Sequence, residues 1–134
     1  VLMIEFFVHG IPRPQGSKRG FYRNGRVVLV EASKQLPEWR EQIVLAAKEA
    51  MMSTDLWYKT EKPVRVECVF FFPKPKTVKR DYPSVAPDLD KLCRSLLDAL
   101  TQAGVYLDDA QVIDLIATKR YSASPGVSVM VSEL

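Results

Sequence analysis

The sequence predicts an α/β (α+β) fold, a mixed β-sheet with two main helices packed on it. Three observations predict this class. Apolar side chains alternate at strand period in several segments, apolar side chains recur at helical spacing in two others, and no repeat or low-complexity linker divides the chain. At 134 residues the chain has the size of one domain with a core of its own. We therefore expect a single domain over residues 1–134.

Four strands and one hairpin are predicted. Residues 2–8 alternate apolar and outward-facing side chains and end near Gly10. Asn24-Gly25 separates two extended runs, and both of these residues tolerate the positive φ that a tight hairpin needs. Residues 64–72 form a second long alternating run that proline stops at Pro73. Residues 112–121 and 127–131 predict two final strands, so the sheet has enough strands to form one layer.

Two helices complete the prediction. In residues 34–52, apolar side chains including Trp39 and Ile43 recur on one face of a helix. Ser33 is a possible N-cap. Pro37 must lie in the first turn or mark the start of the helix, because proline is not tolerated in a helix interior. Residues 88–103 are the clearest helix, with a leucine-rich face and Gly104 directly after the end. We expect the apolar faces of both helices to serve as core.

Positive charge is concentrated in two loop-like segments, although the net charge is only +3. Residues 10–30 hold five bases and no acid, and residues 73–80 hold four more bases. Solvated loops and a surface for a polyanion both remain open as explanations. The bases concerned are Arg13, Lys18, Arg19, Arg23, Arg26, Lys74, Lys76, Lys79 and Arg80.

Composition also argues against several classes of protein. No segment approaches the roughly 20 apolar residues that span a bilayer, so a membrane role is not expected. The first residues lack the basic start and the cleavage site of a signal peptide. The two cysteines, Cys68 and Cys93, fall in apolar patterns rather than at metal-ligand spacing, and we expect buried free thiols. These features predict a cytoplasmic protein.

The chemistry-bearing residues are acids at the two ends of the second helix. Asp88 and Asp90 begin it, and Asp108-Asp109 follow the connection after Gly104. In a regular helix Asp88 and Asp90 would point about 200° apart, so Asp88 must lie outside the helix for the two carboxylates to converge. A bent entry at Pro87-Asp88 could allow this, whereas spacing does not tell whether Asp109 returns to the same place.

Each acid also has a local structural explanation. Asp88 could cap the helix, Asp90 could pair with Arg94 one turn later, and Asp108-Asp109 could be turn residues. The alternative is a metal site, because clustered carboxylates repel unless a cation is bound. Mg²⁺ suits carboxylate, water and phosphate oxygens, and the basic loops would supply a polyanionic partner. The residues alone leave both explanations open.

A family resemblance favours the metal site. The chain resembles the RusA-like Holliday junction resolvases, small dimeric Mg²⁺-dependent endonucleases often encoded by phages and prophages. The family pattern is similar to Asp-Leu-Asp-Asn-Leu-x-Lys, a leucine-rich helix ending in Asp-Ala-Leu, then Ala-Gly-Val and Asp-Asp-x-Gln-Val. The matching residues here are 88–94, 98–100, 103–105 and 108–112.

The resemblance implies the role of each site residue. Asp88, Asp90 and Asp109 would bind Mg²⁺, with Mn²⁺ as a substitute and Asp108 as an additional candidate. Arg94 stands where the family usually has lysine; arginine keeps its proton, so we expect it to stabilise charge on the scissile phosphate rather than to transfer a proton. Lys91 stands where the family usually has asparagine, and it could bind DNA or weaken metal binding.

The function that follows is Mg²⁺-dependent resolution of Holliday junctions and other branched DNA in recombination and repair. The precedent implies a homodimer, since two symmetric cuts need two sites related by a twofold axis. The other predicted DNA contacts are the lysines and arginines of residues 18–26 and 74–80. Two alternatives stay open: a branched-DNA-binding protein without catalysis, and a metal-dependent phosphodiesterase acting on another nucleic acid.

Overall fold

The computed structural model describes residues 2–16, 19–23, 26–30, 35–54 and 59–134. Its elements are β1 (Met3–His9), β2 (Arg19–Arg23), β3 (Arg26–Val30), α1 (Leu36–Ser53), β4 (Val64–Phe72), α2 (Leu89–Ala103), the 3₁₀ helix η1 (Asp109–Gln111), β5 (Val112–Tyr121) and β6 (Gly126–Glu133). The expected mixed sheet with two helices is confirmed.

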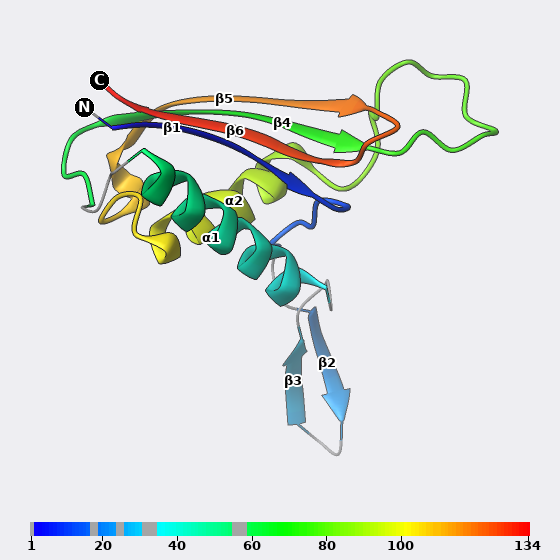
Figure 1. Cartoon of the computed structure of the whole chain (residues 1–134). Helices are drawn as coiled ribbons and strands as arrows, with labels where there is room; N and C mark the ends of the chain where they lie inside the picture. Colours follow the sequence, from blue (N-terminus) through cyan, green and yellow to red (C-terminus); the bar gives the residue numbers. More distant parts are fainter. Residues whose placement is uncertain (1, 17–18, 24–25, 31–34, 55–58) are drawn as a thin grey trace.

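Four strands form the sheet in the order β1-β6-β4-β5 (Figure 1). The pairs β1·β6 and β6·β4 are antiparallel, whereas β4 and β5 are parallel and are connected through α2. Parallel neighbours need a crossover of this kind because a tight turn cannot join them. This crossover places α2 against the sheet beside β5.

The core lies between the sheet and the two helices, which cover the same face of the sheet (Figure 1). Alternation along β4 turns Val64, Val66, Cys68 and Phe70 inward, and all four are buried as predicted. Each fully buried aliphatic or aromatic side chain contributes about 1.5–3 kcal/mol relative to an exposed one. The expectation that the apolar faces of both helices serve as core is therefore confirmed.

The two helices differ in how they begin. Pro37 lies in the first turn of α1, as predicted, but the N-cap is Gln35, so the cap considered at Ser33 is wrong, and Ser33 itself lies outside the described residues. The N-cap of α2 is Asp88 in an extended conformation, which confirms that this residue stands outside the helix. Gly104 ends α2 with φ +81°, a left-handed conformation that glycine adopts without strain.

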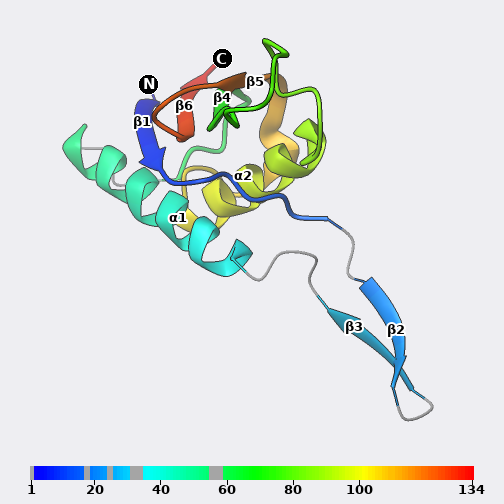
Figure 2. The same cartoon turned by 90° about the vertical axis from the view of Figure 1, so that its right-hand side faces the viewer.

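Strands β2 and β3 form the predicted hairpin and, among the strands that the structure describes, pair with each other alone. In both views the hairpin extends away from the sheet and helices (Figure 2). The predicted turn, Asn24-Gly25, lies outside the described residues.

Both cysteines are buried free thiols, as expected. Within the part of the chain that is described, no helix is both long and apolar enough to cross a bilayer.

Candidate functional site

A groove of about 620 Å³ runs between α2 and the inward-facing side of β5. Much of its lining is apolar, from Leu89, Leu97 and Leu115 among others. Three charged residues also line it: Asp90, Arg94 and Asp109. The structure therefore brings a carboxylate from each end of the α2 segment and a guanidinium into one groove, which sequence spacing left undecided.

Asp88 marks the entry to α2. Its backbone has φ −70° and ψ 140°, and its side chain makes no capping hydrogen bond to the helix. The Nζ of Lys119 donates to the carbonyls of Val85 and Pro87 at 2.8 and 2.9 Å, which holds the backbone just before it. The backbone of this entry is thus fixed, while the exposed Asp88 carboxylate is not used as a cap.

Asp90 lies exposed on the first turn of α2 and is paired with its neighbour. The Nζ of Lys91 donates to Asp90 Oδ2 at 2.8 Å, and this hydrogen bond is the main cause that lowers the pKa of Asp90. The pairing with Arg94 that helical spacing allows is not formed, and Arg94 has no ion-pair partner among the described residues. Arg94 therefore keeps its donors available at the groove.

The turn that carries Asp109 is fastened by Gln111. The Oε1 of Gln111 accepts from the backbone N–H groups of Leu107 and Asp108 at 2.9 and 3.0 Å, and its Nε2 donates to the carbonyls of Thr60 and Lys62 at 2.9 and 3.0 Å. The Asp108 side chain also accepts from Ala110 N, and Asp108 and Gln111 together form a capping box. The turn role considered for Asp108 is confirmed.

Asp109 is exposed on η1 beside other acids. Its pKa is raised above the usual range, first by partial burial, then by a hydrogen bond with Asp108 and by the charges of Asp108 and Asp98. A bound cation would relieve this repulsion. Asp109 is therefore the acid whose surroundings most favour a positively charged partner.

The carboxylates do not form a closed cluster. Across the described ranges of the chain, no three His, Cys, Asp or Glu side chains gather closely enough to enclose a metal ion. The extended entry at Asp88 that the prediction required is present. The donor set still fits Mg²⁺ chemically, because this ion usually takes one or two protein carboxylates and fills its remaining positions with water and phosphate oxygens. Asp90 and Asp109 in one groove meet that requirement.

The predicted DNA-binding residues lie in separate places. Lys74, Lys76, Lys79 and Arg80 are exposed on the loop of residues 73–87, which projects beyond the sheet (Figure 1). Arg19, Arg23 and Arg26 are on the β2-β3 hairpin, and Lys18 lies outside the described residues. Lys91 is at the groove end of α2, paired with Asp90.

The sequence patterns predicted no role for three residues around this site, although Gln111 and Asp98 lie within the matched family pattern. Gln111 could have been found, because an acid followed three residues later by glutamine has the spacing of a capping box. Asp98 and Lys119 had no such signal. Asp98 accepts a hydrogen bond from Gln15, 83 positions away in the sequence, and Lys119 reaches a loop 32 or 34 residues earlier.

Comparison with known proteins gives consistent results. The family model described as "Endodeoxyribonuclease RusA" matches residues 10–132. A Bacillus subtilis protein called YqaN is 32% identical over 98% of this chain and 96% of its own length. The crossover junction endodeoxyribonuclease RusA of Escherichia coli K12 is 32% identical, covering 81% of this chain and 78% of its own, and the phage 82 protein of that name is 30% identical over the same shares.

Proposed function

The chain belongs to the RusA family of endodeoxyribonucleases, and from this premise we propose that it cuts four-way junctions and other branched DNA by Mg²⁺-dependent hydrolysis. The family assignment makes the chain a nuclease of the hydrolase class. The branched substrate, the metal and the residue roles are the proposal. The observation that carries it is the groove beside α2 that is lined by Asp90, Arg94 and Asp109.

The three acids have the role of metal ligands in this proposal. Asp88, Asp90 and Asp109 would hold Mg²⁺, Mn²⁺ would substitute for it, and Asp108 is a further candidate ligand. Bound there, the ion would activate water and polarise the phosphate. Asp88 makes no capping hydrogen bond and Asp90 shares one oxygen with Lys91, so both would have carboxylate oxygens to offer, and the fastened turn carries Asp109 to the same groove.

Arg94 would neutralise charge on the scissile phosphate. It lines the groove with no ion-pair partner among the described residues, so its fork of donors can meet two phosphate oxygens. A guanidinium keeps its proton, so it acts through charge and hydrogen bonding only.

The basic loop and the hairpin would hold the arms of the substrate. Both leave the body at the end of the sheet where β1 and β4 end (Figure 1). Contacts from Lys74, Lys76, Lys79 and Arg80 on the loop and from Lys18, Arg19, Arg23 and Arg26 around the hairpin would go to backbone phosphates, with Lys91 nearer the groove. Binding that rests on phosphate contacts weakens steeply with salt.

Two copies would act together as a homodimer, one cut from each. The face of the sheet opposite the helices has exposed apolar residues, Met3 and Ile116 among them, that a second copy would cover. The substrate also sets the compartment, the DNA-containing cytoplasm of a bacterial or phage-infected cell. Light scattering on the purified chain checks the dimer, and a monomer that retains paired cutting would contradict it.

The decisive test uses a labelled four-way junction and a linear duplex of the same arm sequence, each with Mg²⁺ or with EDTA. We expect symmetric cuts near the branch point with Mg²⁺ only, and little cutting of the duplex. A junction that is shifted but never cut would indicate the non-catalytic binding protein, and equal cutting of the duplex or of RNA would indicate a general phosphodiesterase.

A further inference from the structure

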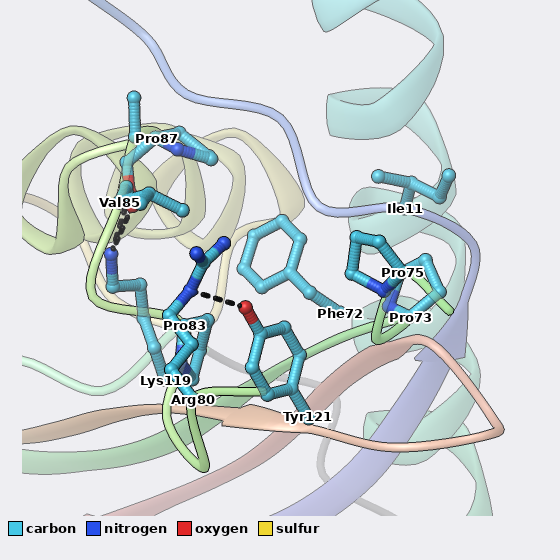
Figure 3. A pocket seen from close by; sticks show the side chains of 11 residues that line it. Ile11, Phe72, Pro73, Pro75, Arg80, Pro83, Val85, Pro87, Lys119 and Tyr121 are labelled. Carbon is cyan, nitrogen blue, oxygen red and sulfur yellow. Dashed lines mark hydrogen bonds between the residues drawn. The ribbon is translucent and has the colours of Figure 1, made fainter. Parts of the chain in front are cut away.

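A second cavity lies at the other side of the α2 entry, outside the carboxylate groove. The loop of residues 73–87 curls over the ends of β4 and β5 and encloses about 220 Å³ (Figure 3). Its walls are the rings of Phe72 and Tyr121, four prolines, Val85 and Ile11. We refer to it as the loop pocket, and the volume admits a single heterocyclic base.

The polar groups of the loop pocket are few and placed at its edge. Arg80 Nε donates to the Tyr121 hydroxyl at 2.9 Å, and its terminal nitrogens have no acceptor among the described residues. Figure 3 shows this guanidinium beside the rings of Phe72 and Tyr121. The Lys74 ammonium lies 5.9 Å from the Tyr121 ring centroid. The flat apolar walls of the loop pocket therefore lie beside the terminal nitrogens of Arg80, which are available as hydrogen-bond donors.

We propose that the loop pocket receives one unstacked nucleobase of the bound DNA, taken from the branch point. This rests on the proposed function, which supplies branched DNA as substrate. Aromatic rings, proline faces and a guanidinium are surfaces on which a base stacks, and each such stack is worth about 1–3 kcal/mol by alanine substitution. Bases at a branch point are the easiest to take out of a duplex, because unstacking costs least where pairing is already lost.

An isolated phosphate is a poorer occupant of this cavity. Its lining is mainly carbon, and Lys119, the other cation there, already donates to the carbonyls of Val85 and Pro87. The charges of Lys74, Lys76 and Lys79 on the same exposed loop suit the backbone on either side of the inserted base.

Position along the chain connects the loop pocket to the cleavage site. Pro87 lines the pocket, and the next residue is Asp88, whose Cα is about 3.8 Å away across one trans peptide unit. A base held in the pocket would fix which phosphate enters the groove beside α2. The loop pocket would thereby set the position and the base preference of the cut.

The test fills the pocket without touching charge or core. Val85 is 48% exposed and lines the pocket, so Val85→Trp places an indole in it, whereas Tyr82→Trp adds an indole to an exposed position of the same loop outside it. Each protein is titrated, without divalent metal so that no strand is cut, against junctions in which single bases near the branch point are replaced by abasic sites.

We expect the wild type to lose about tenfold in affinity at one abasic position, consistent with one lost stack. Val85→Trp should bind the intact junction about tenfold more weakly and be insensitive to that abasic site, with an unchanged melting temperature, and Tyr82→Trp should match the wild type. A wild type indifferent to every abasic position would overturn the proposal, even if Val85→Trp failed to fold. A wild type that binds the junction no better than linear duplex would instead contradict the proposed function.

Discussion

The two acid-bearing segments at the groove beside α2 are held in very different ways. The Asp108–Gln111 turn is tied by four hydrogen bonds from one glutamine side chain and by its own capping box. At the Asp88-Asp90 entry the backbone is held by Lys119, but Asp88 makes no cap bond and the Asp90 carboxylate is hydrogen-bonded to the neighbouring Lys91 side chain. The turn is preorganised, whereas the entry carboxylates are left to be oriented by what binds them.

This difference is consistent with the arrangement of Asp90 and Asp109, which line one groove but do not belong to a cluster that encloses a metal ion among the described residues. Four acids held tightly together would repel one another in the absence of a cation. Here the Asp108–Gln111 turn is fixed, and the Asp88-Asp90 entry is held less firmly. Electrostatic repulsion between carboxylates acts on Asp109, from its neighbours Asp108 and Asp98. The predictions below test this division, beginning with the largest effect.

Removing one carboxylate charge from either segment should strongly reduce the cleavage rate. Asp90→Asn and Asp109→Asn each keep the shape of the side chain but lose a ligand for the cation, and we expect cleavage of a four-way junction to fall by about 10²-fold or more, since metal charge stabilisation is worth several kcal/mol. Binding of the junction should persist. Asp90→Asn protein that cuts at the normal rate would remove Asp90 from the site.

Loosening the fixed turn should mimic part of that loss. Gln111→Leu removes two donors and two acceptor contacts while keeping the size of the side chain, and we expect a 10- to 100-fold higher Mg²⁺ requirement, the usual effect of losing a residue that orients metal ligands. A Mg²⁺ titration of the cleavage rate measures it.

The matched control for this variant is Gln102→Leu. Gln102 is exposed on α2 and only accepts a long hydrogen bond of 3.4 Å from Arg40. It should leave the titration unchanged. Equal behaviour of the two variants would show that Gln111 is not a positioning residue.

Removing the ion-pair partner of Asp90 should lower the Mg²⁺ requirement. Lys91→Asn removes the cation that competes with Mg²⁺ for Asp90 Oδ2, so the pKa of Asp90 should rise towards its usual value. The Mg²⁺ concentration needed for the half-maximal cleavage rate should fall by about two- to fivefold. The effect is small because the ion pair is exposed. Lys48→Asn, exposed on α1, is the control for lost positive charge. A higher Mg²⁺ requirement in Lys91→Asn would contradict the competition.

The smallest effect concerns stability. Because the folded-state pKa of Asp109 is raised, its charged form is disfavoured by folding, and this penalty is present above the folded pKa and disappears below the unfolded value of 3.8. Asp109→Asn should therefore raise the melting temperature by about a degree near pH 7, and the gain should vanish near pH 3. Asp81→Asn, on the exposed proline-rich loop, should change nothing, and a lowered melting temperature for Asp109→Asn would contradict the repulsion.

The sequence by itself determined the elements and the identity of the charged residues. Alternation in residues 64–72 and the leucine face of residues 88–103 predicted β4 and α2 within a residue, because burial of one face imposes a period of 2.0 on a strand and 3.6 on a helix. The same geometry required Asp88 to stand outside α2, as it does.

Only the tertiary structure decided which acids share a groove and what holds them. The return of Asp109 depends on how the chain folds back after Gly104, and Gln111 finds its acceptors on Thr60 and Lys62, 51 and 49 residues earlier. The loop pocket arises where Tyr121 of β5 meets Arg80 of a loop 41 residues before it. Local sequence encodes local periodicity, whereas contacts of this range exist only after the parallel pairing of β4 and β5 has placed the two ends of α2 against the same sheet.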